Sequence, residues 1–455
     1  MFVNRREELG ALNAWWDRAG AALGLVWGRR RVGKTSLLEE FARDKRAIFH
    51  TGAGRPAGDE LRMLSESAGQ VAKFGARDLG ERPFADWDDA LDALAAAATR
   101  ERLLLVIDEF PDLAAGSPEL PGVLRAFWDR AQGKTKLRIL VCGSAVRTME
   151  ALQEERAPLY GRFDLSLLLH PFRPHEASAM LKGLDPADKA LVWGLVGGVP
   201  LYLNWWDSER SVKQNLLRLA CTPGGRLLDE GRLVLATEGD LGGLGGLALR
   251  AIASGRTRHN EIEQAIGSDP SRVLERLVEL RLVERLVPVT ENPARTRRRI
   301  YRIADNFLAF WLGVLDRHRS AISRGLGGQI LSVLTEQLDD HMGDRWEAAF
   351  RQHLLRLAAG GELGERIVDI GRWWQDAPPV EIDAVALAGR SREAVLLGEA
   401  KWARRADGTA LRAGLEAKAT ALPALADDVS YAIAARDQVK GGDGVLPITA
   451  ADIFG

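Results

Sequence analysis

The chain has 455 residues, of which 46% are hydrophobic and 27% charged, a profile typical of a globular protein that excludes a disordered or fibrous one. Its formal net charge is −1, so any affinity for nucleic acid must come from local basic patches. The two cysteines, Cys142 and Cys221, are too few for a disulfide framework. No apolar run approaches the ~18 residues of a membrane span, and the opening residues do not form a secretory signal. We therefore expect a cytoplasmic protein without a membrane partner.

Short apolar runs alternate with amphipathic stretches through the first 170 residues. Such alternation is typical of βαβ units, in which helices cover both faces of a parallel sheet. The sequence therefore predicts an α/β fold for residues 1–170. The runs expected to form strands are 23–27, 47–50, 103–107 and 137–142.

A glycine-rich segment follows the first of these runs and matches the pattern GxxxxGK[ST] in full. Glycines allow backbone N–H groups to surround phosphates, and the start of the following helix adds a favourable dipole. Lys34 would reach the β- and γ-phosphates, and the Thr35 hydroxyl would ligate Mg²⁺. We therefore expect this segment to bind ATP and Mg²⁺. Its residues are Gly28, Arg29, Arg30, Arg31, Val32, Gly33, Lys34, Thr35 and Ser36.

Two acidic residues, Asp108 and Glu109, end the continuous apolar run 103–107. Ligands of open α/β sheets bind at the carboxyl ends of the strands, so these acids are expected beside the phosphates. Asp108 would hold Mg²⁺ through water, and Glu109 would polarise the attacking water. Ser144, just beyond the next strand, is a candidate sensor of the γ-phosphate. Arg162 is a candidate arginine finger, within the chain or from a neighbouring subunit, with an ordinary surface arginine as the equal alternative.

Strand signals disappear beyond residue 170, and helical patterns predict a lid over residues 171–240. A glycine-rich joint at 241–247 then leads into a predicted winged helix over residues 241–305. This domain would consist of three helices and two strands, with the polar segment 290–298 between the strands as its wing.

The predicted winged helix is locally basic, with 12 arginines and seven acidic residues between Arg250 and Arg302. Several of these arginines cluster in the wing, which is typical of a surface that contacts phosphates. The expected recognition helix, 272–280, alternates acids with arginines and offers no Asn or Gln for reading bases. We therefore expect sequence-independent contact with DNA. The alternative is that this domain packs against another domain or subunit.

The last predicted domain, 306–455, opens with long helices and then turns to two strands, 380–387 and 393–400. Strand alternation puts Glu399 and Lys401 on one face, and in a hairpin Asp383 approaches them. Two converging carboxylates favour a hard divalent cation, Mg²⁺ or Mn²⁺, bound by Asp383, Glu399 and the carbonyl of the residue between Glu399 and Lys401. Lys401 would orient or activate a water for attack on a phosphodiester. A solvated strand end is the alternative for this pattern.

Three further segments carry a family resemblance: FVNRREEL at 2–9, GGVPLYL at 197–203 and YRIADNFLAFW at 301–311. Together with WGRRRVGKT at 27–35, they resemble the archaeal-type AAA ATPases, which are close to the STAND class of signalling NTPases. The resemblance implies that the opening segment lies near the adenine and that GGVP lies in the lid. It also implies that the last of the three segments joins a winged helix to a C-terminal domain.

By the same resemblance, the C-terminal domain is similar to the PD-(D/E)XK nucleases. Asp383, Glu399 and Lys401 match the D–(D/E)xK signature of that superfamily, and Glu347 fits its acidic residue in an earlier helix. This sequence departs from the pattern in one respect, because no proline stands directly beside Asp383. The resemblance implies catalytic roles for all four residues.

The whole sequence thus predicts a P-loop NTPase with a helical lid, a winged helix and a PD-(D/E)XK nuclease-like domain. In this hypothesis, ATP controls the access of DNA to the carboxylate site. One alternative is a STAND-type nucleotide-driven switch, whose C-terminal domain only binds nucleic acid or a partner protein. Another is a transcription regulator that uses the winged helix. A homo-oligomer is compatible with these hypotheses, since Arg162 could act on a neighbouring subunit.

Overall fold

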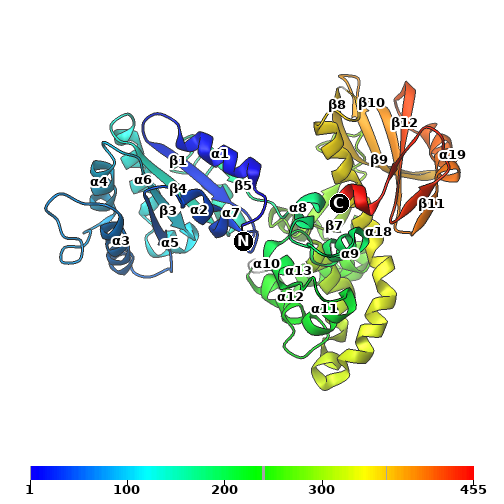
Figure 1. Cartoon of the computed structure of the whole chain (residues 1–455), viewed down its shortest axis with the longest axis horizontal. Coiled ribbons are helices and arrows are strands. Elements are labelled where there is room, and N and C mark those ends of the chain that lie inside the picture. Colours follow the sequence, from blue (N-terminus) through cyan, green and yellow to red (C-terminus); the bar gives the residue numbers. More distant parts are fainter. Residues whose placement is uncertain (1, 238–240, 365) are drawn as a thin grey trace. The chain divides into compact units, whose positions relative to one another are not determined.

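The computed structural model describes residues 2–237, 241–364 and 366–455, and the chain forms two compact units, Met1–Pro171 and Phe172–Gly455 (Figure 1). Within the described ranges, no helix combines the length and the apolar character that crossing a bilayer requires.

A five-stranded parallel sheet forms the centre of the first unit, with the strand order β2-β3-β4-β1-β5. Its strands are β1 (Ala22–Trp27), β2 (Ala47–Thr51), β3 (Leu103–Asp108), β4 (Leu137–Gly143) and β5 (Leu165–Leu168). The first four agree with the predicted runs to within one residue at each end, and the α/β fold with a parallel sheet is confirmed. β5 was not predicted; it is a four-residue edge strand that pairs with β1.

Helices cover both faces of this sheet (Figure 1). They are α1 (Arg6–Trp16), α2 (Lys34–Ala42), α3 (Ala57–Val71), α4 (Trp87–Ala97), α5 (Phe110–Gly116), α6 (Leu120–Ala131) and α7 (Val146–Ala151). Every residue of β1 is buried, and its alternate side chains enter different cores: Leu23 and Leu25 enter one, Ala22 and Val26 the other. A strand that is covered on both faces needs apolar side chains at every position. This explains why a continuous apolar run in the sequence predicted β1.

The second unit opens with helices. They are α8 (Pro174–Ser178), α9 (Pro186–Val196), α10 (Pro200–Trp205), α11 (Val212–Leu219) and α12 (Arg226–Thr237). The final residues of the predicted lid, 238–240, lie outside the described residues. In the part of the chain that the structure describes, the buried side chains of the predicted lid belong to a large hydrophobic cluster that extends from residue 172 to residue 454. The predicted boundaries within this unit remain predictions.

Three helices and a two-stranded antiparallel sheet follow. They are α13 (Gly242–Ala253), α14 (His259–Ile266), α15 (Ser271–Glu279), β6 (Val283–Leu286) and β7 (Ile300–Ile303). The glycine-rich segment 241–247 was expected to form a joint, but most of it lies in α13. The helix is stabilised by the burial of Leu249 and Ile252 in the core, which outweighs the low helix propensity of glycine.

A mixed five-stranded sheet, ordered β14-β12-β10-β9-β8, dominates the C-terminal part. Its strands are β8 (Ile367–Asp376), β9 (Pro379–Ala388), β10 (Glu393–Lys401), β12 (Leu425–Ala435) and β14 (Val445–Ile448). β8, β9 and β10 are antiparallel neighbours, whereas β10, β12 and β14 are parallel. The two predicted strands correspond to β9 and β10, while β8, β12 and β14 were not predicted.

The remaining elements of the second unit precede this sheet in the chain or lie between and after its strands. They are α16 (Asn306–Phe310), η1 (Trp311–Leu315), η2 (Asp316–His318), α17 (Arg319–Ala321), η3 (Ile322–Leu326), α18 (Gly327–Ala359), β11 (Arg405–Asp407), α19 (Gly408–Ala419), β13 (Gln438–Lys440) and α20 (Ala450–Phe454). The long helix α18 contacts β8, β9 and β10, and α19 connects β10 to its parallel neighbour β12 through the intervening β11. The charged side chains described below lie on these elements.

The segment between β6 and β7 packs on β8. The Val289 backbone N–H donates a hydrogen bond to the Arg372 carbonyl at 2.9 Å, and Arg392 Nη2 donates to the Val289 carbonyl at 3.0 Å. Arg298 Nη1 donates to the Trp374 carbonyl at 3.1 Å. The predicted wing is therefore held against the edge strand of the C-terminal sheet.

Candidate functional sites

The predicted phosphate-binding segment forms the turn between β1 and α2. Gly28 has φ +150°, and a Cβ placed on it would lie 2.4 Å from the Leu169 carbonyl oxygen. Gly33 has φ +89° at the residue before α2. Side chains are excluded at the first position and strained at the second. The turn therefore needs glycine at both ends, and it presents backbone N–H groups at the start of a helix.

Lys34 is held inside this turn. Its Nζ donates to the carbonyls of Gly28 and Arg29, both at 3.0 Å, and the residue is only 6% exposed. Burial lowers the pKa of Lys34, an effect opposed by the nearby Cys142, Glu109 and Asp108. The amine is thus positioned among carbonyl acceptors that an anionic ligand can replace.

The carboxyl ends of β1, β3 and β4 bring the other predicted ATP-site residues together, because these strands are neighbours. Thr35 Oγ1 donates to Asp108 Oδ2 at 2.7 Å. Ser144 Oγ lies within 3.1 Å and 2.9 Å of the two Glu109 carboxylate oxygens. Asp108 and Ser144 are buried, and Glu109 has φ +49°. The two acids therefore have different partners: Asp108 binds the Thr35 hydroxyl, whereas Glu109 binds Ser144, the residue after β4.

Arg162 has a different environment. Its Nε and Nη2 donate to the two carboxylate oxygens of Asp129 on α6 at 2.9 Å and 3.0 Å. Its Nη1 donates to the Tyr160 carbonyl at 3.1 Å. These contacts do not involve the β1–α2 turn, so the structure does not bring Arg162 to the cluster around Lys34. Its role as an arginine finger remains a prediction.

Arg5 is a further contact of the turn that the sequence argument did not single out. It is 4% exposed, and its Nη2 donates to the carbonyls of Val32 at 2.9 Å and His170 at 2.7 Å. A buried arginine that binds carbonyls fixes the backbone that it touches. The only sequence signal was its place in the segment FVNRREEL, since an arginine near the start of a chain is normally exposed.

A second cluster of charged side chains lies on α18, β8 and β9 in the C-terminal part. Glu347, Glu381 and Asp383 each place a carboxylate oxygen within 4.8 Å of the others. Arg372 of β8 forms ion pairs with Glu381 and, at 3.9 Å, with Glu347. Three converging carboxylates are a donor set that suits a hard divalent cation.

Asp383 sits where the β9–β10 ladder ends. The last paired residues are Ala384 and Gly398, and Asp383 Oδ2 then accepts the Ala400 backbone N–H at 2.9 Å. Arg351 Nη1 donates to the Asp383 carbonyl at 2.6 Å. Burial raises the pKa of Asp383, and the neighbouring Glu399 raises it further. The carboxylate is therefore fixed in position in a site that disfavours its charge.

Glu399 and Lys401 lie on one face of β10, as strand alternation predicted. Lys401 Nζ contacts Glu399 Oε1 at 2.7 Å, and Lys418 Nζ of α19 contacts Oε2 at 2.8 Å. Burial acts to raise the pKa of Glu399, but these two hydrogen bonds outweigh it and lower the pKa. Burial acts to lower the pKa of Lys401, and the bond to Glu399 outweighs it and raises the pKa.

Glu347 has the most perturbed carboxyl of this cluster. Burial raises its pKa to about 7, with a further contribution from Asp383, while Arg372 and Arg351 act in the opposite direction. A carboxyl that desolvation and a like charge keep partly protonated is typical of functional sites, although structural networks also produce it.

Three members of this cluster were missed by sequence reasoning. Glu381 could have been found, because it lies two residues before Asp383 and strand alternation puts both on one face. Arg372 and Lys418 carried no such signal, since they lie on an unpredicted strand and on a helix distant in sequence. Only the packing of α18, β8 and α19 around β9 and β10 brings them to the carboxylates.

Two pockets flank Arg372. One, of about 820 Å³, is lined by five arginines and three acidic residues among others. These charged residues are Arg285, Arg302, Arg351, Arg372, Arg392, Glu284, Glu291 and Asp369. The other pocket, of about 340 Å³, lies beside Glu381 and is also lined by Arg258 and Trp374. The carboxylate cluster thus adjoins one hollow with more arginines than acids and a smaller one in which two arginines face two acids, Asp344 and Glu381.

Comparison with known proteins addresses the first of these sites. A family model described as an ATPase domain predominantly from Archaea matches residues 2–205, which include the β1–α2 turn, Asp108 and Glu109. This stretch of the chain is similar to the archaeal-type P-loop ATPases. The first unit is therefore an ATPase domain, and its family implies a bound nucleotide with Mg²⁺. A second model, described as archaeal and bacterial proteins of unknown function, matches residues 311–412.

Relatives of the ATPase domain occur in archaea. An uncharacterized protein of Methanocaldococcus jannaschii is 27% identical over 414 residues, which are 88% of this chain and 88% of that protein. An uncharacterized ATP-binding protein of the same organism is 50% identical over 46 residues, 10% of this chain and 78% of that protein. The Walker-type ATPase PABY2304 of Pyrococcus abyssi matches with a TM-score of 0.52 at 21% identity, over 68% of this chain and 96% of that one. This last likeness concerns the fold alone.

The residues of the ATPase domain fit a magnesium nucleotide. The turn at Gly28 admits no side chain, the Lys34 amine is buried among loop carbonyls, and the Thr35 hydroxyl meets Asp108 at 2.7 Å. Backbone N–H groups and Lys34 would hold the phosphates. Thr35 and, through water, Asp108 would hold Mg²⁺.

Proposed function

We propose that the chain is an ATPase coupled to nucleic-acid binding, and that its C-terminal part cleaves phosphodiesters with the help of a divalent cation. The observation that carries the proposal is the convergence of Glu347, Glu381 and Asp383 within 4.8 Å, next to the ion pair between Glu399 and Lys401. Strands β8–β10, helix α19 and strand β12 frame these residues. Helix α18 supplies the earlier acid.

In the ATPase domain, Glu109 would accept a proton from the water that attacks the γ-phosphate. Its carboxylate is already hydrogen-bonded to the Ser144 hydroxyl, which holds it at the end of β3. Mg²⁺, when bound, neutralises the charge that develops on the phosphates. Arg162 would assist only if its ion pair with Asp129 opened, or if it acted on a neighbouring subunit.

In the C-terminal part, Glu347, Asp383 and Glu399 would hold the cation, and Glu381 is a further ligand that the geometry offers. These four residues suit a hard divalent cation because all of them are carboxylates. Glu347, Asp383 and Glu399 are at least partly buried. The cation, when bound, supplies charge stabilisation for a phosphorane-like transition state. Lys401 would orient the attacking water, since its amine is held by Glu399 at 2.7 Å.

Nucleic acid is the substrate class that the surrounding charge favours. The larger hollow beside Arg372 has five arginines against three acids, and the predicted winged helix contributes Arg302 to its wall and Arg258 to the wall of the smaller hollow. Arg258 is partly neutralised by its 2.6 Å bond to Asp376, and Arg298 is used against β8. We infer that the wing positions the predicted winged helix against the cleavage site. Its exposed side chains Arg295 and Arg297 would then contact nucleic-acid phosphates.

The test is a cleavage assay on linear duplex, supercoiled and single-stranded DNA with Mg²⁺ or Mn²⁺, with and without ATP. The parent chain would be compared with Lys401→Ala, Lys34→Ala and the control Lys440→Ala, which changes an exposed lysine on β13. Cleavage that disappears in Lys401→Ala but persists in Lys440→Ala supports the proposal. The Lys34→Ala result then tells whether ATP controls cleavage.

A nucleotide-driven switch is the second candidate, and the position of Arg372 favours it. The guanidinium pairs with both Glu347 and Glu381, so it neutralises charge that a cation would otherwise neutralise. In that case the C-terminal part binds nucleic acid or a partner protein without cutting. Stimulation of ATP turnover by DNA, with no cleavage under any condition, would establish this candidate.

A further inference from the structure

A third charged site lies in the ATPase domain, away from the P-loop. A pocket of about 580 Å³ opens among the turns that precede β1, β2, β3 and β4. The P-loop, Asp108 and Ser144 follow the carboxyl ends of β1, β3 and β4. Because the strands are parallel, the pocket and the ATP site lie at opposite edges of the same sheet.

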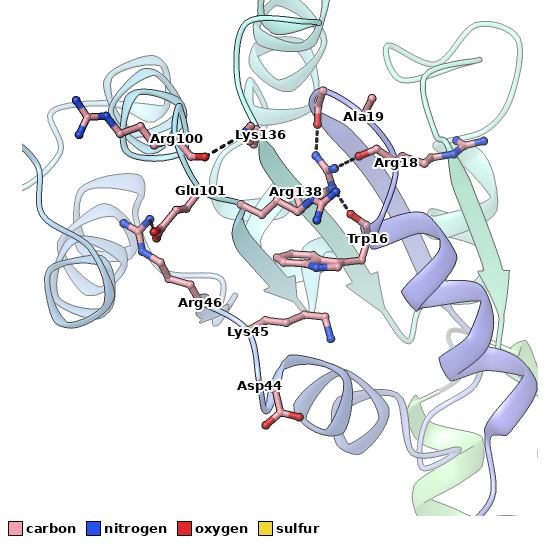
Figure 2. Close-up of a pocket in the computed structure, with 12 residues that line it drawn as sticks. Trp16, Arg18, Ala19, Asp44, Lys45, Arg46, Arg100, Glu101, Lys136 and Arg138 are labelled. Atoms are coloured by element: carbon pink, nitrogen blue, oxygen red, sulfur yellow. Dashed lines mark hydrogen bonds and ion pairs between the residues drawn. The ribbon is translucent and has the colours of Figure 1, made fainter.

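The lining of this pocket is strongly cationic (Figure 2). Seven of its residues are arginine or lysine, whereas two are acidic. The cationic residues are Arg18, Lys45, Arg46, Arg100, Arg102, Lys136 and Arg138, and the acidic ones are Asp44 and Glu101. Like charges gathered in one hollow repel one another, so such a lining is stabilised when an anion binds.

Main-chain carbonyls hold several of these cations in place. The guanidinium of Arg138, a fully buried residue, donates to the Trp16 carbonyl at 3.2 Å and to the carbonyls of Arg18 and Gly20. Lys136 Nζ donates to the Arg100 carbonyl at 2.7 Å. Figure 2 shows the bonds of Arg138 at the turn between α1 and β1, and the bond between Lys136 and the Arg100 carbonyl apart from them. A carbonyl orients a cation but does not cancel its charge, unlike a carboxylate.

The acids near the pocket neutralise only part of its charge. Asp17 pairs with Arg102 at 3.6 Å, Asp164 with Arg18 at 3.2 Å, and Glu101 with Arg46 at 3.9 Å. Within the described ranges, the remaining four cations have no carboxylate at ion-pair distance. These four are Lys45, Arg100, Lys136 and Arg138. A buried guanidinium without an anionic partner is costly to desolvate, which favours a bound anion beside Arg138.

The aromatic wall of the pocket favours phosphate over a stacked base. Trp16 is half-buried, and Lys45 Nζ lies 5.6 Å and Arg102 Cζ 5.9 Å from the centre of its ring. The indole therefore helps to hold two cations through cation–π contacts. Because the Trp16 ring contacts these two cations, it stabilises positive charge in the pocket and does not offer a free face on which a base could stack.

We propose that this pocket binds a phosphate group at a site distinct from the P-loop. Guanidinium and ammonium groups match phosphate oxygens, and Arg100 and Lys136 are exposed at the rim where a ligand enters. The phosphate belongs either to a nucleic-acid backbone or to a free polyphosphate. The proposal goes beyond ATP turnover and phosphodiester cleavage, and it depends on neither.

The experiment locates the ligand by its protection of a lysine in the full-length protein. Lysines are acetylated briefly, and modification of Lys136 is quantified by mass spectrometry relative to Lys213, an exposed lysine of α11. The P-loop is first filled with a non-hydrolysable ATP analogue and Mg²⁺. One arm adds a 20-nucleotide single-stranded DNA, and the other adds inorganic triphosphate. Protection of Lys136 by either probe supports the proposal, and the arm that protects identifies the source of the phosphate.

The variant Arg100→Glu tests the charge itself, and Arg125→Glu is its matched control. Arg100 makes no side-chain hydrogen bond in the described structure, and Arg125 is an exposed arginine on α6 outside the pocket. We expect Arg100→Glu to weaken the binding of the protecting probe on the order of tenfold. The slope of log K against log salt for DNA binding should fall by about one, as expected for the loss of one phosphate contact. Arg125→Glu should change neither. Absence of Lys136 protection with both probes, or equal effects of the two variants, overturns the proposal.

Discussion

At the scale of single residues, the two acids after β3 have separate environments. Asp108 accepts a hydrogen bond from Thr35, whereas Glu109 is bonded to Ser144 after β4. The first acid is therefore positioned toward the turn that would hold the metal, and the second toward the strand end where a water would attack. This division makes binding and turnover separable by mutation.

Glu109→Gln should reduce ATP turnover on the order of 10²–10⁴-fold, because it removes the proton acceptor but keeps the shape. The Kd for ATP should change little. Steady-state turnover and equilibrium binding measured on the same preparation check this. Ser144→Ala serves as the comparison and should lower turnover less. An equal loss of binding and turnover in Glu109→Gln would contradict the assignment.

His341 makes the second unit sensitive to acid. Its ring packs edge-on against Phe310, and Nε2 lies 3.1 Å from the Gly194 carbonyl. Burial, with a smaller contribution from Arg345, lowers the pKa of His341 to about 3. The unfolded chain takes up a proton below pH ~6.5, whereas the folded chain does not, so stability is present above that pH and falls as the pH decreases.

We expect His341 to contribute a loss of about 2 kcal/mol of unfolding free energy between pH 7.5 and pH 5, from one pKa shift. Urea unfolding of the parent chain at the two pH values measures the total change. His341→Gln cannot titrate, so the difference between the two pH values should shrink in this variant. An unchanged pH dependence would exclude His341 as a source of it.

At the scale of elements, the contact between the predicted wing and β8 depends on close packing. A Cβ on Gly371 would lie 2.9 Å from Cβ of Val289, the residue whose N–H binds the Arg372 carbonyl. Glycine at this position therefore lets the segment after β6 approach the edge strand. Covering an exposed edge in this way also protects it from pairing with another chain.

Gly371→Ala should destabilise the second unit by about 1–3 kcal/mol, because the added methyl group forces the two segments apart. Trypsin should then cut faster at Arg295 and Arg297 in the wing. Gly414→Ala is the control: it lies within α19 with no heavy atom within 4 Å of the added Cβ, and it should stabilise by about 0.5–1 kcal/mol. Equal protease sensitivity in both variants would mean that the contact does not hold the wing.

At the scale of the whole molecule, the two units have separate hydrophobic cores. Two clusters of buried side chains lie entirely within residues 1–171, and three others lie within 172–455. Units with their own cores can unfold as separate cooperative transitions. The ATP site lies in the first unit and the carboxylate cluster in the second.

A magnesium complex of a non-hydrolysable ATP analogue should therefore stabilise only one transition. At a concentration of 100 Kd the expected gain is ~2.7 kcal/mol. Calorimetry with and without the analogue measures it, and Lys34→Ala should abolish the shift. A single transition that moves as a whole would mean that the two units unfold together.

Sequence patterns predicted the proximity of the candidate ATP-site residues because these residues follow the ends of buried parallel strands. Continuous apolar runs found β1, β3 and β4, and the chain places the P-loop, Asp108, Glu109 and Ser144 directly after them. The carboxyl ends of neighbouring parallel strands meet at one edge, so local order was enough to predict their proximity. The placement of Glu399 and Lys401 on one face followed from strand alternation, and the antiparallel pairing of β9 with β10 brings Asp383 to the end of the same ladder.

Other features depended on the tertiary structure. The sequence by itself determined the strands β1 to β4, β9 and β10 and the side chains at their ends, because these depend on local periodicity, whereas β5, β8, β12 and β14 were not predicted. Only the packing decided that Glu381 and Arg372 join Glu347, and that Asp129 pairs with Arg162. It also decided that turns far apart in sequence gather the cations around Arg138. Such contacts are set by how helices and strand edges meet in three dimensions, and no short-range pattern of residues records them.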